Sequence, residues 1–280
     1  MRIDIKTWVA TEKAFLAKKV SEMKRAPKLL IIQVGDDPAS NSYIKGKMAD
    51  AAECGIEATL FKTTNKKTII PFLEQTGDEY DGIILQEPSG LDRVEREKVL
   101  NLITPWQDVD GFRKDSAHEP CTPAGIMDII FNHIFPGYQG LTGYKVAVIG
   151  RGELVGKPLV PMLIDKHATV FSCNSGTAPE VLKDIIKTSD IIISATGQKN
   201  LITAEMLSKN LTYIIDAGIT VNDNGKLCGD WDKKIYDLPN VSVTTVPGGV
   251  GLTTRLALMK NVVNAAIHRL SSVDSIPDFM

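Results

Sequence analysis

Short, unbroken runs of apolar residues recur along the chain, and each is bounded by Gly, Pro, Asp or Asn. The runs are rich in Ile and Val and have the length of strands. Because their apolarity is continuous and does not alternate, it is typical of strands buried on both faces, as in parallel sheets. The predicted strands are residues 29–34, 58–61, 82–85, 145–150, 168–171, 190–195 and 213–218, with VSVTT at 241–245 as a further one.

Helical patterns lie between these strands. They cover residues 9–24, 40–54, 93–103, 123–134, 154–166, 178–187 and 203–209, and a long amphipathic pattern comes last, at 253–270. Alternation of strand and helix predicts an α/β protein with parallel sheets.

A chain of 280 residues, at roughly 150 per domain, is long enough for two α/β domains. The best boundary is the polar, Gly- and Pro-marked stretch at 108–122. We expect an N-terminal domain over residues 1–120, a Rossmann-like domain over residues 121–252, and a last helix (253–280) that returns to the first domain.

Composition excludes several classes of protein. The chain has 34 acidic and 32 basic side chains, a net charge of −2, which gives no electrostatic reason to expect a nucleic-acid partner. No stretch has the ~18 uncharged apolar residues that span a bilayer, and the charged start is unlike a signal peptide. The cysteines are far apart, as are the histidines, so we expect reduced thiols, a cytoplasmic protein and no protein-held metal.

A glycine-rich turn carries the first chemical signal. The strand KVAVIG runs into RGELVGKP, which places Gly150, Gly152 and Gly156 between a strand and a helix. Glycines there let the backbone approach a phosphate that faces the helix N-terminus. The spacing GxGxxxG also fits a tight turn that binds nothing.

The residues at the end of the next strand indicate which dinucleotide would bind. An NAD-preferring fold has an Asp or Glu there, about 20 residues after the glycines, whereas this chain has FSCNSGT at 171–177. Arg151 and Ser175 would suit a 2′-phosphate, which favours NADP as cofactor. Arg151 could equally be a solvated turn residue.

Polar residues of the first half form a second candidate site. Tyr43 and Lys47 are four residues apart, hence on one face of a helix, where a ring and an ammonium could meet a flat heterocycle. Gln86 comes after a strand, at the edge where α/β sheets bind ligands, and Asp110 lies on a turn. The plainer alternatives are a half-exposed helix face with Lys47 in solvent, and an Asx turn.

The segment VPGGVG at 246–251 has three glycines and a proline between a strand and the last helix. Such a composition indicates unusual backbone angles or a close backbone approach. A ligand-lining loop, forming one wall of an interdomain cleft, and a structural turn are both open.

Six motifs occur in one order from residue 43 to residue 254. They are YIKGK, GIILQEP, QDVDGF, PCTPAGI, VIGRGELVGKP and VPGGVGLTT. In this the chain resembles the methylenetetrahydrofolate dehydrogenase/methenyltetrahydrofolate cyclohydrolase family. The resemblance implies a folate cleft between an N-terminal α/β domain and a Rossmann-like NADP domain, and a homodimer. It also implies NADP-dependent oxidation of 5,10-methylenetetrahydrofolate and hydrolysis of the methenyl product to 10-formyltetrahydrofolate.

The resemblance also assigns roles to residues. Tyr43 would stack on the pterin side, Lys47 would be the catalytic lysine, Gln86 its hydrogen-bonding partner, and Asp110 the anchor of the pterin's amide and amino edge. Other substrate-binding residues would be Leu85, Gly248, Gly249 and Leu252. The cofactor would meet Gly150, Arg151, Gly152, Gly156, Ser175, Ala195, Thr196, Gly197 and Ile219.

Some positions depart from the family's usual pattern. Glu87 replaces an apolar residue of QLPLP, Leu252 replaces the proline of PGGVGPMT, and Asn174 replaces the histidine of CHS. Three alternatives therefore stay open: a monofunctional dehydrogenase of this family, an unrelated two-domain NADP oxidoreductase of the shikimate dehydrogenase type, and a folate- or nucleotide-binding module without catalysis.

Overall fold

A computed structural model describes residues 1–208, 210, 212–221 and 226–274. The chain forms two compact units. The first comprises Ala10–Cys121 and the chain from Arg255 onward, and the second comprises Met1–Val9 and Thr122–Thr254. Within the described ranges, no helix is long and apolar enough to cross a membrane.

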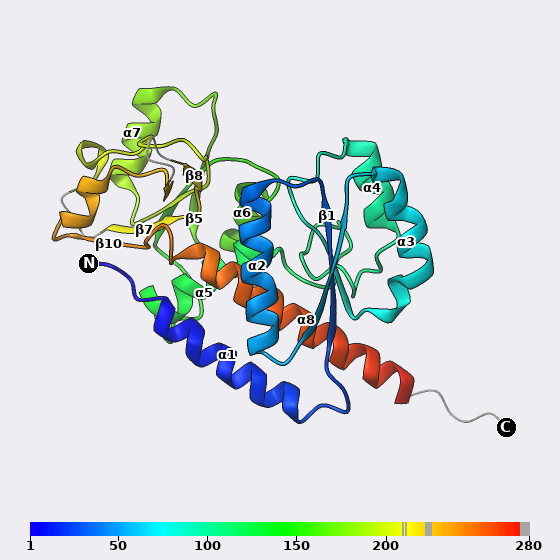
Figure 1. Cartoon of the computed structure of the whole chain (residues 1–280). Helices are drawn as coiled ribbons and strands as arrows, with labels where there is room; N and C mark the ends of the chain where they lie inside the picture. Colours follow the sequence, from blue (N-terminus) through cyan, green and yellow to red (C-terminus); the bar gives the residue numbers. More distant parts are fainter. Residues whose placement is uncertain (209, 211, 222–225, 275–280) are drawn as a thin grey trace. The chain divides into compact units, whose positions relative to one another are not determined.

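The first unit is built on a parallel sheet, as predicted, and its strand order is β2-β1-β3. Its elements are β1 (Lys28–Val34), α2 (Pro38–Glu53), β2 (Glu57–Thr63), α3 (Ile69–Thr76), β3 (Gly82–Leu85) and α4 (Arg93–Asn101), with 3-10 turns at Lys66–Thr68 and Gly77–Glu79. Figure 1 labels its strand β1 and its helices α2, α3 and α4.

The second unit contains a five-stranded parallel sheet of order β10-β7-β6-β4-β5. Its elements are β4 (Lys145–Ile149), α6 (Gly156–Asp165), β5 (Thr169–Cys173), α7 (Pro179–Thr188), β6 (Ile191–Ser194), β7 (Thr212–Asp216), the antiparallel pair β8 (Thr220–Val221) and β9 (Leu227–Cys228), and β10 (Val241–Val243), with 3-10 turns at Ala204–Met206 and Lys233–Asp237. The strand order reverses at β4, as in doubly wound folds, so the predicted fold class of two parallel α/β domains is confirmed.

The division between the units falls inside helices. These are α1 (Lys6–Ser21), α5 (Cys121–Ile129), which a π-helical turn at Ile130–Ile134 extends, and α8 (Val250–Asp274). Residues 1–9, which we expected in the first domain, are grouped with the second unit. Their strand-like start explains this, because Ile3 N donates to Val243 O at 3.0 Å.

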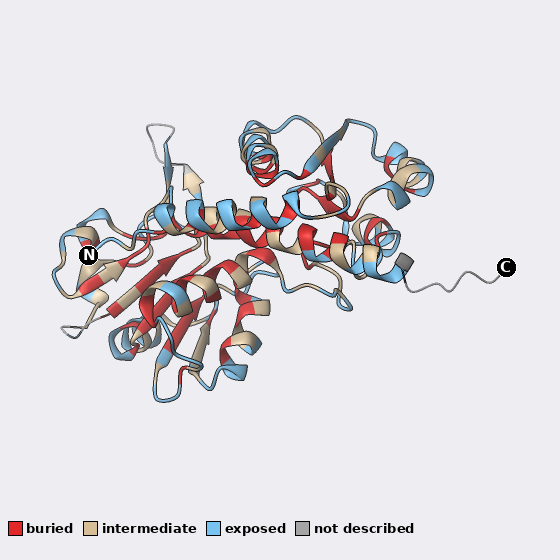
Figure 2. Cartoon of the chain, turned by 90° about the horizontal axis from the view of Figure 1, so that it is seen from below, coloured by how far each residue is buried: buried red, intermediate tan, exposed pale blue. Residues whose placement is uncertain are grey.

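The cores follow the apolar runs. Both units bury branched aliphatic side chains from their central strands, and Figure 2 shows these strands in red beneath helices with pale blue outer faces. Strand β1 is buried along its middle, as the continuous apolar pattern predicts.

Two expectations about elements are wrong, and one helix was missed. Strand β2, at one edge of its sheet, is largely exposed, whereas β3, at the other edge, is buried and pairs through Ile83 with residues 107–108. The helix predicted over 203–209 is only a 3-10 turn at Ala204–Met206, and residue 209 lies outside the described residues. Helix α3 was not predicted, because its segment IIPFLEQT contains a proline and is only eight residues long, too short to show a clear helical pattern.

The buried centre of the second sheet gives a stability prediction. Ile193 in β6 is fully buried, so Ile193→Ala removes apolar contacts and leaves a cavity. We expect urea denaturation to show a loss of about 2–5 kcal/mol in the free energy of unfolding. Val181→Ala, at a side chain 47% exposed on α7, is the control and should change it by less than about 0.5 kcal/mol. Equal effects of the two changes would contradict the assignment of the core.

Candidate active site

Helix α2 carries the two side chains that begin the site. The chain leaves β1 through Gly35, whose φ of +83° favours glycine, and Asp37 caps the helix by accepting a hydrogen bond from Ser40 N at 2.7 Å. Pro38 occupies the first turn. The helix therefore starts two residues earlier than predicted, with Asp37 as a cap that sequence reasoning did not single out.

The environment of Lys47 is unlike a solvated helix face. Its side chain is 5% exposed, and Nζ lies 4.0 Å from Asp110 Oδ2 and 5.2 Å from the centroid of the Tyr43 ring. The structure thus brings Tyr43, Lys47 and Asp110 together, and the alternative in which the lysine extends into solvent is wrong.

Asp110 reaches this cluster from the segment between α4 and α5. Burial raises the pKa of its carboxyl group, and the positive charge of Lys47 opposes that shift. The neighbouring acid holds the loop, because Asp108 Oδ2 accepts a hydrogen bond from Arg113 N, five residues further on, at 2.7 Å. Asp110 is therefore left facing the lysine.

Gln86 comes directly after Leu85, the buried last residue of β3. Its Nε2 donates to Glu87 O at 2.6 Å, an interaction only the amide nitrogen can make, and its buried Oε1 has no hydrogen-bond partner. Among the described residues no hydrogen bond joins Gln86 to Lys47, so the predicted partnership is not formed in this structure. The free Oε1 is an acceptor available to a ligand.

The carboxylate of Glu87, the departure noted in the sequence, is turned to α4. Oε1 accepts from Arg96 Nε at 2.9 Å and Oε2 accepts from Ser89 N at 2.7 Å. Its charge is thereby paired, although it still contributes to raising the pKa of Asp110.

The glycine turn of the second unit has the tight geometry that a phosphate-binding loop needs. Gly150 has a φ of +112°, and a Cβ on it would overlap Ala195 O. A Cβ on Gly156 would overlap Gly150 O, whereas one on Gly152 would meet nothing within 4 Å. The ends of β4 and β6 therefore meet at the reversal of strand order, where α/β sheets bind ligands.

Arg151 is exposed but held in place. Its Nε donates to Ser172 Oγ at 3.0 Å and its Nη2 to Ser172 O, at the end of β5. Ser175 lies just beyond that strand and is exposed, as are Gly152 and Gly197, the latter with a φ of +66°. Ala195 and Thr196 are half-buried, and Ile219 is 54% exposed.

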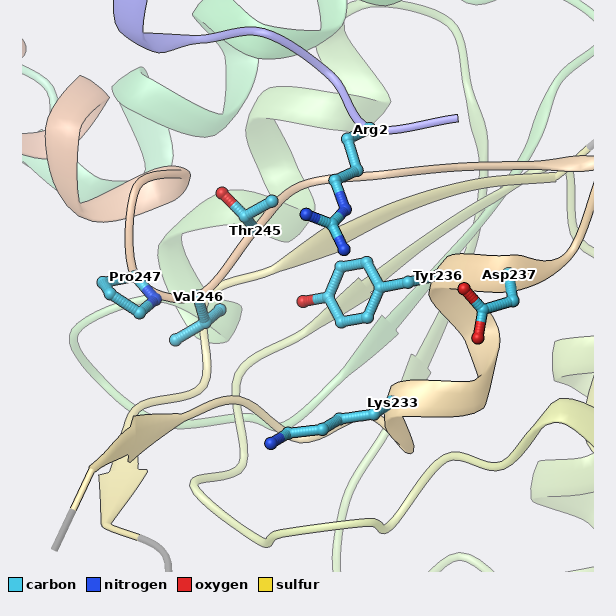
Figure 3. A pocket seen from close by; sticks show the side chains of 7 residues that line it. All are labelled: Arg2, Lys233, Tyr236, Asp237, Thr245, Val246 and Pro247. Carbon is cyan, nitrogen blue, oxygen red and sulfur yellow. The ribbon is translucent and has the colours of Figure 1, made fainter.

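The loop VPGGVG has the unusual backbone that its composition predicts. Gly248 has a φ of +102°, and a Cβ on Gly249 would lie 2.5 Å from Thr245 O. Leu252, half-buried, donates its N–H to Gly249 O at 2.9 Å at the start of α8. Residues 245–247, with Arg2, Lys233, Tyr236 and Asp237, border a cavity of about 620 Å³ in the second unit (Figure 3).

Sequence reasoning missed the residues that support the loop after β6. Thr196 N donates to Asp230 Oδ2 at 2.8 Å, and Asp216 and Ser194 lie in the same buried network. The available signal was a polar residue closing each of two apolar strands, IIIS and TYIID.

Comparison with known proteins agrees with this architecture. Residues 3–110 match the model of the tetrahydrofolate dehydrogenase/cyclohydrolase catalytic domain, and residues 120–270 match that of the NAD(P)-binding domain of the same proteins. The chain therefore belongs to the tetrahydrofolate dehydrogenase/cyclohydrolase family, and its second unit is an NAD(P)-binding domain. The alternative of an unrelated oxidoreductase is thereby excluded.

Individual relatives cover nearly the whole chain. The bifunctional protein FolD of Bacillus subtilis (strain 168) is 34% identical, over 96% of this chain and 98% of its own length. The crystal structure of the bifunctional enzyme FolD from Campylobacter jejuni matches with a TM-score of 0.86 at 30% identity, over 96% of this chain and 99% of that one. That of the Trypanosoma brucei enzyme, complexed with NADP and an inhibitor, has a TM-score of 0.85 at 25% identity, over 96% and 98%.

The glycine turn gives a stability prediction with an internal control. Gly156→Ala would force a methyl group onto Gly150 O, a backbone atom that cannot move aside alone. Urea denaturation should show a loss of about 1–3 kcal/mol in the free energy of unfolding. Gly152→Ala, in the same turn but facing open space, should change it by less than about 0.5 kcal/mol. If both variants were equally stable, the turn would not have the close approach described.

Proposed function

We propose that the chain oxidises 5,10-methylenetetrahydrofolate with NADP and hydrolyses the resulting 5,10-methenyltetrahydrofolate to 10-formyltetrahydrofolate. Membership of a family of bifunctional dehydrogenase/cyclohydrolases supports both steps. The observation that carries the proposal is the buried ammonium of Lys47 beside Asp110 and Tyr43.

The second unit fits a dinucleotide. Gly150 and Gly156 have no Cβ, so the end of β4, the end of β6 and the start of α6 lie close together there. Backbone N–H groups at this turn can therefore approach a phosphate. Bound NADP would supply the hydride acceptor. We propose that residues 150–156 hold the pyrophosphate, and that Ala195, Thr196, Gly197 and Ile219 surround the ribose and nicotinamide.

The hydride step requires orientation more than proton transfer, because the nitrogen lone pairs of the folate drive hydride off the bridging carbon. We propose that Tyr43 stacks on the pterin ring and that Asp110 accepts hydrogen bonds from its amide and amino N–H groups. Leu85, Gly248, Gly249 and Leu252 would complete the substrate's surroundings. Asp110 already lies 4.0 Å from Lys47, so one ligand could meet both.

The hydrolytic step requires a proton donor. Water adds to the amidinium carbon, one C–N bond breaks, and the released ring nitrogen takes up a proton. We propose that Lys47 Nζ donates to this nitrogen, and that the unpartnered Oε1 of Gln86 accepts a hydrogen bond from the lysine or the water. Of the water's two protons, one returns to the Lys47 amine and the other leaves to solvent, which balances the reaction.

We propose NADP over NAD. The guanidinium of Arg151 is hydrogen-bonded to Ser172 near the end of β5, and Ser175 lies just beyond that strand. NAD-preferring folds have an acidic residue at this strand end, whereas this chain has Asn174. A planar guanidinium binds a phosphate with charge-assisted hydrogen bonds.

We further propose a cytoplasmic homodimer that acts on small-molecule folates. The free state of the four cysteines agrees with a reducing compartment. The dimer is implied by the resemblance, and sedimentation of the purified protein at twice the mass of the chain would support it.

Lys47→Ala tests the division between the two steps. We expect hydrolysis of methenyltetrahydrofolate to fall at least about 100-fold, in the range for loss of a general acid, while reduction of NADP by methylenetetrahydrofolate stays measurable. Lys45→Ala, at an exposed lysine of the same helix, is the control and should leave both rates unchanged. Equal loss of both activities in a folded Lys47→Ala protein would contradict the proposed role.

Arg151→Ala tests the cofactor preference. Losing a charged hydrogen bond of about 1.5–3 kcal/mol should lower kcat/KM for NADP at least about tenfold and leave that for NAD little changed. Lys187→Ala, at an exposed lysine of α7, is the matched control. A wild-type protein that prefers NAD, or a variant that loses both cofactors equally, would count against NADP specificity.

A further inference from the structure

Two carboxylates are buried behind the loops to which the nicotinamide is assigned. Asp216, the last residue of β7, is 2% exposed, and Asp230, just after β9, is 0% exposed. Neither side chain forms a salt bridge with any residue in the described part of the chain. Buried carboxylates without a cation are costly, and such groups occur where they have a specific role.

The two carboxylates hold the main chain of both loops from the inside. Asp230 Oδ2 accepts from Thr196 N at 2.8 Å, in the loop after β6. Asp216 Oδ1 accepts from Gly218 N at 2.9 Å, in the turn after β7. Asp216 Oδ2 accepts from Asp230 N at 3.0 Å, which links the two aspartates.

Glycines make this arrangement possible. A Cβ on Gly218 would overlap the carboxylate of Asp230, and a Cβ on Gly229 would overlap that of Asp216. Each aspartate therefore packs directly against the backbone of the segment that holds the other. The positions of Thr196, Gly218 and Ile219 thus depend on the two acids.

The network extends to the ends of three neighbouring strands. Ser194 Oγ, at the end of β6, donates to Asp216 Oδ1 at 3.2 Å and accepts from Trp231 Nε1 at 2.7 Å. Asp216 N donates to Thr244 Oγ1, just after β10, at 2.9 Å. Hydrogen bonds to Asp216 therefore connect the carboxyl ends of β6, β7 and β10.

We propose that Asp216 and Asp230 are positioning residues for the dinucleotide: through the N–H groups of Thr196 and Gly218 they fix the surface on which the nicotinamide lies. This inference rests on the proposed function and extends it. Neither residue touches substrate in this scheme.

The pair also makes dinucleotide binding depend on pH. Burial and the charge of Asp230 raise the pKa of Asp216 to about 7. The other titratable groups near it are Tyr236 and, over the Tyr236 ring, Arg2. Well below pH 7 Asp216 is mostly protonated. As the pH rises through about 7, Asp216 gains a negative charge beside the carboxylate of Asp230, so the two acids repel each other, the loops should loosen and the affinity for NADP should fall.

The test is the dissociation constant of NADP for the full chain, measured by titration calorimetry at about pH 6 and about pH 8.5, on either side of that pKa of about 7. Asp230→Ala removes the acceptor of Thr196 N and should raise Kd about tenfold. Asp230→Asn keeps an acceptor but removes the charge. It should bind as wild type does at the lower pH and lack the weakening at the higher one.

Two controls separate positioning from general damage. Asp237→Asn makes the same chemical change at an exposed acid of the adjoining 3-10 turn and should leave Kd and its pH dependence unchanged. The cyclohydrolase rate of each variant should stay within about twofold of wild type, a change below ~0.5 kcal/mol, since Lys47 belongs to the other unit and contacts neither aspartate in this scheme.

Three results would overturn the inference. They are an Asp230→Ala protein that binds NADP as wild type does, pH profiles of wild type and Asp230→Asn that coincide, and a cyclohydrolase rate that falls in proportion to the affinity. A wild-type protein that binds NADP but turns over no folate would overturn the proposed function instead, and Kd would still test the positioning role.

Discussion

Burying the ammonium of Lys47 is the constraint on which the site of the first unit depends. A charged side chain that is 5% exposed costs several kcal/mol unless other groups compensate it. Asp110 at 4.0 Å and the face of Tyr43 at 5.2 Å supply that compensation. Asp110 is itself buried, so each charge makes the other tolerable, and removing one leaves the other uncompensated. A flat ligand with N–H donors on one edge and basic nitrogens on another suits such a pair.

In both units the candidate site residues follow the first and the third strand of a sheet with the same strand order. In each sheet the first strand lies between the second and the third, so that the order is β2-β1-β3 in one unit and β5-β4-β6 in the other. Helix α2, with Lys47, comes after β1, and the glycine turn comes after β4, while Gln86 and Ala195 come after the third strands. Reversal of strand order opens a place for a ligand at the carboxyl edge. At this edge the first unit presents buried polar side chains, and the second presents backbone groups that its glycines leave uncovered.

The sequence predicts features that depend on residues close together in the chain, and it misses features that depend on residues brought together by folding. The spacing of Tyr43 and Lys47 predicts their adjacency, and the glycines of RGELVGKP predict the tight turn, because both depend on local geometry. The burial of Lys47 is not visible in helical periodicity, since Asp110, which makes it possible, lies 63 positions further on. The role of Asp110 came only from resemblance to a family. Strand β2 looks buried from its composition, but it lies at a sheet edge and is largely exposed. Asp216 and Asp230 went unnoticed because their partners are backbone N–H groups that no side-chain pattern reveals.

One chain is thus proposed to carry two reactions, with hydride transfer dependent on the glycine turn and hydrolysis dependent on Lys47. The most decisive experiment monitors both products of the unmodified protein in one reaction mixture of methylenetetrahydrofolate and NADP. We expect NADPH and 10-formyltetrahydrofolate to accumulate together, at rates proportional to enzyme concentration. Two results would contradict the proposal: NADPH forms but methenyltetrahydrofolate is hydrolysed only at its spontaneous rate, or no NADPH forms at all.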